Sequence, residues 1–440
     1  MKMKNVEDIY PLTPLQQGML FHSLSTPGAS MYCDQLSWII DDKIDVTAMR
    51  TAWQRVVNHH PILRASFLWE DLDEPLQVIR SKVRLPWQEF DWQSLNPQEQ
   101  KKELKRFLKK DLQKGFELSK APLMRISLIR LDENKFRIVW SLHHLLLDGW
   151  SLSLVLNEVF RIYESLRHGD EIEPAQTAPF RDYIAWLQKQ DFNEARDFWK
   201  QALKGHNGLS LLFKGNNGAS TAGENTEYGE CQVILSTAET GMLEKYARTH
   251  GFTPNSLIQG AWAILLSRYS GEQRVIFGAT VSGRPADLPG AESMIGLFIN
   301  TLPVAVTIDY GQTLSANIRQ IQDKQVEARQ FEHTPLMQIK KWSNIPKSLP
   351  IFDSILVFEN YPVDLNSICS NCKFDSESVL YSGHTHFPLH LRVYPGEQLS
   401  VTLVYNTGLV HNAIAEQMLN YLRQILINIP TIIETNLYQF

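Results

Sequence analysis

Hydrophobic patterns typical of strands and of helices alternate along the whole chain, and this alternation limits the possible folds most. In the first half, strand-like patterns cover residues 32–40, 62–69, 123–131 and 135–143, and helix-like patterns cover 46–59, 97–113 and the stretch from Ser151, the expected N-cap, to Leu166. No short-period repeat is present, so a solenoid is not expected. A chain of 440 residues also exceeds what one hydrophobic core usually organises. The sequence therefore predicts an α+β protein, a mixed αβ sandwich, with two lobes.

The second half repeats the alternation after an acidic, proline-bearing stretch at 169–179, which suggests a hinge. The predicted lobes are therefore 1–175 and 176–440. Beyond the hinge, helices are expected at 180–203 (with Trp186 and Trp199 buried), 254–269, 313–332 and 411–427, a mobile glycine-rich loop at 205–230, and strands at 274–281, 352–358, 387–393 and 399–405, the last two as a hairpin.

Composition excludes several classes of protein. Lys and Arg number 43 against 48 Asp and Glu, a net charge of −5, whereas nucleic-acid binding needs a basic excess or stripe. The longest charge-free apolar stretch, 252–267, is too short to span a bilayer, and the sequence opens without a secretory hydrophobic region. Four cysteines do not form a disulfide framework. We expect a cytoplasmic protein without nucleic-acid or membrane partners.

One segment carries residues suited to chemistry: His143-His144-x-x-x-Asp148-Gly149, at a predicted strand-to-helix junction. Adjacent residues of a strand point to opposite faces, so one histidine is expected to face a cavity and the other to pack. Asp148 needs a cationic partner if it is buried. Paired histidines in a strand are commonly structural, and the Asp-Gly pair after them favours a functional site.

This spacing resembles the core motif of the condensation domains of nonribosomal peptide synthetases, in a superfamily related to chloramphenicol acetyltransferase. Four further stretches are similar to motifs of the same family: Tyr10-Pro-Leu-Thr-Pro-Leu-Gln-Gln-Gly18-Met, His60-Pro-Ile-Leu-Arg64-Ala-Ser-Phe67, Ser282-Gly-Arg284-Pro and Ile295-Gly-Leu-Phe-Ile-Asn300-Thr301. The likeness extends from about Ile9 to about Leu426. It implies two acetyltransferase-like lobes in a V-shaped pseudo-dimer, with a tunnel between them and a bridging loop at about 282–303.

Two related activities remain as alternatives. Epimerisation domains carry a glutamate where this chain has Ser282-Gly-Arg284-Pro, and a stand-alone acyltransferase would use a soluble amine or alcohol. Thr13, Leu15 and Gly18 in the opening motif look like members that accept a D-configured donor. The resemblance therefore favours peptide-bond formation, in a D-donor, L-acceptor subtype.

The resemblance also implies roles for residues and for partners. His144 would be the catalytic group, with His143, Asp148, Gly149 and Arg64 in support. The family keeps this arginine near the active site, so Arg64 is the candidate partner of Asp148. Contacts in the tunnel or from the second lobe would come from Trp150, Ser282 and Asn300. No cofactor is expected to be covalently bound, because both substrates would arrive on phosphopantetheine arms of separate upstream and downstream carrier proteins, beside domains such as adenylation.

Two other histidine patterns have simpler explanations. Cys369-x-x-Cys372 followed by His384-x-His386 suggests zinc, but zinc fingers usually separate the last histidines by three to five residues. No metal site is therefore predicted. His59-His60 lies at the end of a predicted helix, where a basic side chain favours the helix dipole.

Overall fold

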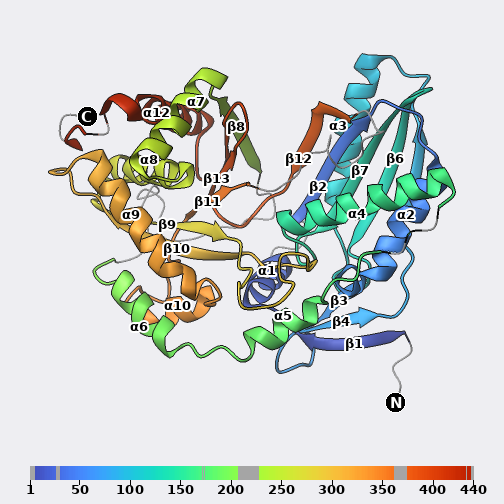
Figure 1. Cartoon of the computed structure of the whole chain (residues 1–440), viewed down its shortest axis with the longest axis horizontal. Helices are drawn as coiled ribbons and strands as arrows, with labels where there is room; N and C mark the ends of the chain where they lie inside the picture. The colour runs from blue at the N-terminus through green and yellow to red at the C-terminus, as the bar shows by residue number, and fades with distance from the viewer. Residues whose placement is uncertain are drawn as a thin grey trace. The chain divides into compact units, whose positions relative to one another are not determined.

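The computed structural model describes residues 5–25, 30–170, 172, 174–206, 227–360, 374–432 and 434–437. Its contacts divide the chain into two compact units (Figure 1). The first comprises Met1–Gln190, Arg284–Phe298 and Tyr361–Thr385, and the second Asp191–Gly283, Ile299–Asn360 and His386–Phe440. A single boundary after residue 175 describes these units incompletely, because two later segments join the first unit.

The first unit is built on a five-stranded sheet with the order β12-β2-β7-β6-β5. All neighbours in it pair antiparallel except β5 and β6, which are parallel. A smaller antiparallel sheet has the order β1-β4-β3. The strands are β1 (Val6–Pro11), β2 (Cys33–Ile40), β3 (Ala65–Leu68), β4 (Leu76–Arg80), β5 (Trp87–Asp91), β6 (Met124–Asp132), β7 (Lys135–His143) and β12 (Phe374–Ser382).

Helices of the first unit are α1 (Pro14–Ser25), α2 (Val46–His59), α3 (Pro97–Lys114), α4 (Gly149–His168) and α5 (Phe180–Leu187). Helices α2 and α4 lie side by side across one face of the larger sheet (Figure 1). Their packing buries aromatic rings, as where Trp53 of α2 meets Trp140 of β7 edge to face at 4.9 Å. Such a pair adds about 0.5–1.5 kcal/mol to its area burial.

A buried polar cluster ties α3 to the larger sheet. The carboxylate of Asp111 accepts hydrogen bonds from Arg125 Nε at 2.6 Å, Gln35 Nε2 at 2.8 Å and Ser141 Oγ at 2.6 Å. Because the buried Asp111 carboxylate has a cationic partner in Arg125 and accepts hydrogen bonds from all three side chains, it avoids the free-energy penalty of an unpaired buried charge.

The second unit is built on a six-stranded mixed sheet with the order β10-β9-β11-β13-β14-β8. β11 pairs parallel with β9 and β13, and the other pairs are antiparallel. Its strands are β8 (Tyr228–Ile234), β9 (Arg274–Val281), β10 (Asn300–Thr307), β11 (Ser354–Phe358), β13 (Leu389–Tyr394) and β14 (Ser400–Asn406). Its helices are α6 (Asn193–Ala202), α7 (Thr237–His250), α8 (Pro254–Ser270), α9 (Leu314–Ala328), α10 (Leu336–Trp342) and α12 (Asn412–Ile432).

Among the described residues of this unit, two hydrophobic cores are formed. The larger one joins α7, α8, α9 and α12 to one set of sheet residues, and the smaller one joins α6 and α10 to residues of β9, β10 and β11. Gly260 lets α8 approach α9 closely, since a Cβ there would lie 2.4 Å from Cγ1 of Ile318 on α9. The nearly all-apolar α8 is therefore an internal helix of the unit.

Several predictions of local structure need correction. The helix expected at 180–203 is two helices, α5 and α6, because the Asp191 side chain accepts from the amide of Asn193 and competes with helical hydrogen bonding. Trp186 is only half-buried, and its indole donates to Asp287 at 3.2 Å. The strand expected at 62–69 begins only at Ala65, after a 3₁₀ turn that starts at Pro61. Of the loop expected at 205–230, residues 207–226 lie outside the described part.

Candidate active site

Strand β7 ends at His143, and helix α4 begins six residues later, at Gly149. The prediction that Ser151 caps this helix is wrong. The N-cap is Asp148, whose Oδ1 accepts from the Ser151 amide at 2.8 Å. A carboxylate at this position satisfies a free amide of the first turn and is favoured by the helix dipole. Asp148 thus fixes where the helix starts.

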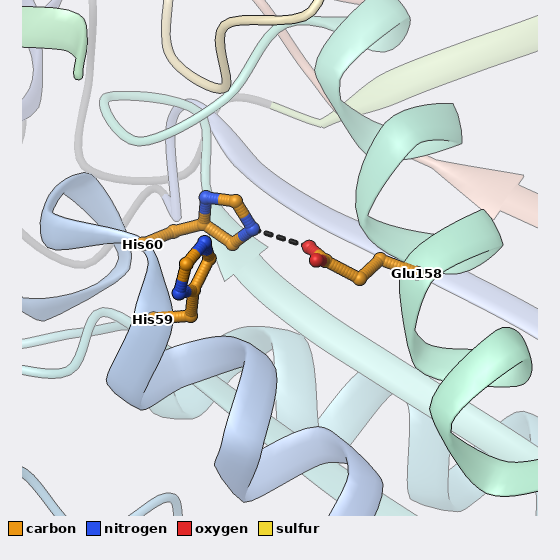
Figure 2. A group of neighbouring side chains, drawn as sticks. All are labelled: His59, His60 and Glu158. Carbon is orange, nitrogen blue, oxygen red and sulfur yellow. Dashed lines mark hydrogen bonds and ion pairs between the residues drawn. The ribbon is translucent and has the colours of Figure 1, made fainter. Parts of the chain in front are cut away.

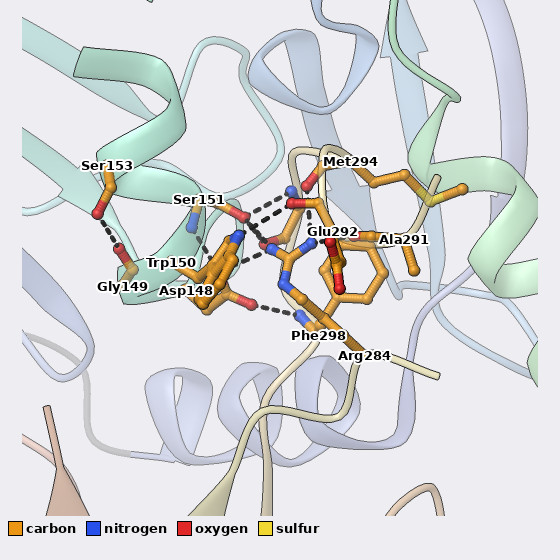
Figure 3. A network of polar contacts seen from close by, with 11 residues as sticks. Asp148, Gly149, Trp150, Ser151, Ser153, Arg284, Ala291, Glu292, Met294 and Phe298 are labelled. Carbon is orange, nitrogen blue, oxygen red and sulfur yellow. Dashed lines mark hydrogen bonds and ion pairs between the residues drawn. The ribbon is translucent and has the colours of Figure 1, made fainter. Parts of the chain in front are cut away.

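The ion-pair partner of Asp148 is Arg284, which arrives on the segment Arg284–Phe298 (Figure 3). Arg284 Nη2 lies 3.4 Å from Asp148 Oδ1 and donates to Ser151 Oγ at 2.9 Å. Asp148 Oδ2 accepts from the amide of Phe298 at 2.9 Å. The Asp148 side chain is fully buried, so this pairing offsets a desolvation cost of several kcal/mol.

The same segment is held at several further points. Arg284 Nη1 donates to the carbonyl oxygens of Ala291 and Met294, and its guanidinium lies 4.1 Å over the Phe298 ring. Ser151 Oγ donates to the carbonyl of Gly296 at 2.7 Å and lies 3.1 Å from its amide nitrogen. Burial lowers the pKa of Arg284, and Asp148 opposes that shift. The first turn of α4 therefore holds the segment Arg284–Phe298, which lies more than 130 residues further along the sequence.

The prediction that Arg64 pairs with Asp148 is wrong. Arg64 is buried, but its Nη1 lies 2.5 Å from Glu7 of β1 and also donates to the carbonyl of Arg80 on β4. Arg64 therefore serves the small sheet. The sequence alone did not show that Glu7 would supply the neutralising charge.

The two histidines of the motif have different surroundings. His143 is 2% exposed, its Nδ1 accepts from the amide of Leu145 at 3.2 Å, and its Nε2 lies 3.4 Å from Ser23 Oγ. Since Nδ1 accepts, the neutral ring carries its hydrogen on Nε2. Burial lowers the pKa of His143 to about 3, so the ring is neutral near pH 7. His143 therefore packs and hydrogen-bonds.

His144 is more accessible, with 17% of its side chain exposed. Its amide donates to the carbonyl of Tyr32 at 2.8 Å, and its ring Nδ1 lies 2.9 Å from Oδ2 of Asp34 on β2. His144 Nδ1 and Asp34 Oδ2 are within ion-pair distance, but their geometry is not that of an aligned hydrogen bond. An imidazole with one nitrogen beside a carboxylate can use the other to accept a proton.

Asp34 is the residue of this site that sequence reasoning missed. It is 4% exposed on a strand whose other residues are mostly buried. A single acid inside the otherwise uncharged stretch Cys33–Ile40 was the available signal, because such a residue is rarely buried without a partner.

The remaining predicted residues are distributed over both units. Gly149 is buried in the first turn of α4, and Trp150 next to it donates to the carbonyl of Glu292 at 2.9 Å (Figure 3). In the second unit, Ser282 is exposed. Asn300 donates to the carbonyls of Glu332 and Thr334, both at 2.8 Å. Asn300 thus satisfies local backbone groups, and tunnel contacts from these residues stay predictions.

Within the described residues, one group of three possible metal ligands lies close together: His59, His60 and Glu158 (Figure 2). Hydrogen bonds already account for it. His60 Nε2 bonds to Glu158 Oε2, Glu158 Oε1 accepts from the Ala175 amide at 3.1 Å, and His59 Nε2 lies 3.0 Å from the Ala175 carbonyl oxygen. The group joins the end of α2 to α4. Cys369 and Cys372 lie outside the described residues.

Comparisons with known proteins agree with this architecture. The starter condensation domain of rhizomide synthetase, solved with C8-CoA and Leu-SNAC, superposes with a TM-score of 0.81 at 17% identity, over 97% of this chain and 95% of that one. A four-domain nonribosomal peptide synthetase bound to AMP and glycine gives 0.82 at 19% identity, over 100% of this chain and 34% of that one. The predicted mixed αβ, acetyltransferase-like fold is confirmed, whereas the V shape stays a prediction.

Sequence comparison gives the family. The profile described as "Condensation domain" matches residues 6–437, and the chain belongs to this family. Linear gramicidin synthase subunits C and B of Brevibacillus parabrevis are 42% and 43% identical, each over 96% of this chain. The chain spans only 5% and 8% of those proteins. Across the described residues, no helix has the length and apolar character needed to cross a membrane.

Proposed function

We propose that this condensation domain forms an amide bond between a carrier-bound acyl or peptidyl thioester and a carrier-bound aminoacyl acceptor. The observation that carries the proposal is the contrast within the histidine pair. His143 is sealed and neutral, whereas His144 keeps an accessible ring beside a carboxylate. Of the two rings, His144 is the one that a substrate can reach.

The reaction makes moderate demands on the residues. The acceptor α-amine has a pKa near 7.7–8.0 and attacks the thioester carbonyl, and the thiol leaves. His144 Nε2 takes the proton that the amine loses and passes it to the leaving thiolate, a contribution of roughly 10²–10⁴-fold, and alignment of the two substrates supplies about 7–11 kcal/mol.

Asp148 acts through the structure that it holds, by starting α4 and neutralising Arg284. The amide of Gly149, in the first turn of that helix, is our candidate donor to the developing oxyanion.

Partners and location follow from the same proposal. The substrates arrive on phosphopantetheine arms of an upstream donor carrier and a downstream acceptor carrier, with adenylation domains nearby, in the cytoplasm. The small share of the gramicidin synthase subunits that the chain spans supports a place within a longer synthetase. Thr13, Leu15 and Gly18 support a donor ending in a D-residue.

The test is a reconstituted reaction with two loaded carriers, using donors that end in matched L- and D-residues. We expect dipeptide from both carriers together, faster with the D-donor, and loss of product in His144→Ala. Product with a free amine but none with a carrier-bound acceptor would instead indicate a stand-alone acyltransferase. Inversion of the donor without dipeptide would indicate an epimerase. An undiminished rate in His144→Ala would refute the catalytic assignment.

A further inference from the structure

Asp34 lies at the meeting point of three strands of the first unit. It is on β2, between β7, after which His144 follows directly, and β12, which contains Tyr381. One carboxylate oxygen, Oδ2, lies 2.9 Å from His144 Nδ1. The other, Oδ1, accepts a hydrogen bond from the Tyr381 hydroxyl at 2.9 Å. Tyr381, Asp34 and His144 are thus connected in series, with the Asp34 carboxylate in contact with the other two side chains.

We propose that Asp34, itself held by Tyr381, is a positioning residue that sets the tautomer and orientation of His144. This inference rests on the proposed function only in taking His144 as the catalytic group. A carboxylate can only accept, so the hydrogen of the neutral imidazole belongs on Nδ1. Nδ1 lies 2.9 Å from Oδ2, and a hydrogen on Nδ1 puts the lone pair of the neutral ring on Nε2, the nitrogen that must take the proton from the acceptor amine.

The neighbouring histidine gives an internal contrast. His143 Nδ1 accepts from a backbone amide, so its hydrogen is on Nε2. The two adjacent rings are therefore expected to be opposite tautomers, each fixed by the group beside its Nδ1. The Asp34 carboxylate beside Nδ1 favours the base-competent form of His144.

Packing around Asp34 limits where its carboxylate can go. A Cβ added at Gly383, just after β12, would lie 2.3 Å from Asp34 Oδ1 and 2.9 Å from the Tyr381 hydroxyl. Real Cβ atoms do not approach so closely, so glycine is needed for the carboxylate to occupy this place. Gly383→Ala should therefore push Asp34 away from Tyr381 without removing any hydrogen-bonding side chain.

The direct test is ¹⁵N NMR of the histidine rings at pH 8.5, where an ordinary imidazole is neutral. The His144 signals are identified by their loss in His144→Gln. The proposal predicts the Nδ1–H form in the wild-type protein and a mixture of tautomers in Asp34→Ala and Gly383→Ala. A wild-type His144 in the Nε2–H form, or a tautomer unaffected by both variants, would overturn it.

Kinetics supply a second readout with the loaded carriers. We expect kcat to fall about 10–100-fold in Asp34→Ala and about 3–10-fold in Tyr381→Phe, as parts of the general-base contribution, with KM nearly unchanged. Asp111→Asn is the matched control, a buried carboxylate with structural partners. It should lower stability and leave the His144 tautomer unchanged. Activity lost in His144→Ala but intact in Asp34→Ala would refute this inference and leave the proposed function standing.

Discussion

Removal of the Arg284 guanidinium should destabilise the first unit more than most single substitutions. In Arg284→Ala, the fully buried Asp148 keeps its hydrogen bonds from the Ser151 and Phe298 amides but loses its ion-pair partner. Breaking a buried pair in this way costs about 3–5 kcal/mol. For a folding unit of 150–250 residues, each kcal/mol lowers Tm by about 2–4 °C, so we expect a fall of roughly 6–20 °C.

The assay is urea unfolding followed by tryptophan fluorescence, since Trp150 lies 5.7 Å from the guanidinium. A double-mutant cycle with Asp148→Asn should give a coupling of about 1–3 kcal/mol, because the double variant no longer buries an unpaired charge. Arg196→Ala, at an exposed pair with Asp197, is the control and should change stability by less than about 0.5 kcal/mol. A loss below 1 kcal/mol in Arg284→Ala would refute this account of the Asp148 pairing.

Three further predictions concern packing and pH. Gly296→Ala should cost about 1–3 kcal/mol in urea unfolding, because a Cβ there would lie 2.1 Å from the Phe180 ring, whereas Gly18→Ala meets no atom within 4 Å and should be neutral or stabilising. His143 has a pKa of about 3 in the folded protein, so between pH 6.5 and 3 only the unfolded chain takes up the proton. The free energy of unfolding should therefore fall as the pH drops through this range, and His143→Gln should flatten the slope by up to about 1.4 kcal/mol per pH unit. Burial raises the pKa of Asp353 to about 7, so the free energy of unfolding should fall as the pH rises from 3.8 to 7. Asp353→Asn should raise the free energy of unfolding at pH 8 and remove that dependence. A pH profile of stability unchanged in His143→Gln or in Asp353→Asn would contradict the pKa assigned to that residue.

Local pattern was sufficient for elements whose hydrophobic period is clear. The helix expected at 46–59 is α2, and the strand expected at 135–143 is β7, because strong periodicity and capping residues act over a few residues. Pattern failed where a tertiary contact decides the structure. β12 adds to β2 at the edge of the sheet although Phe374 and its register partner Ile40 are 334 positions apart in the sequence, and no local signal predicts such a pairing.

The site shows the same limit. The strand-to-helix junction predicted at His143-His144-x-x-x-Asp148-Gly149 is confirmed, since β7 ends at His143 and α4 begins at Gly149. The motif did not identify the partners of these residues, because the sequence does not show which distant cationic side chain will contact a given carboxylate. Asp148 pairs with Arg284 rather than Arg64, and the group beside His144 is Asp34, on a different strand.

The central claim is that the accessible ring of His144 promotes amide formation between two carrier-bound substrates. Its most direct measurement is the single-turnover rate of dipeptide formation from preloaded donor and acceptor carriers, compared between the wild-type protein and His144→Ala at equal folded concentration. The account predicts a fall of at least about 100-fold in the variant. Equal rates would contradict it.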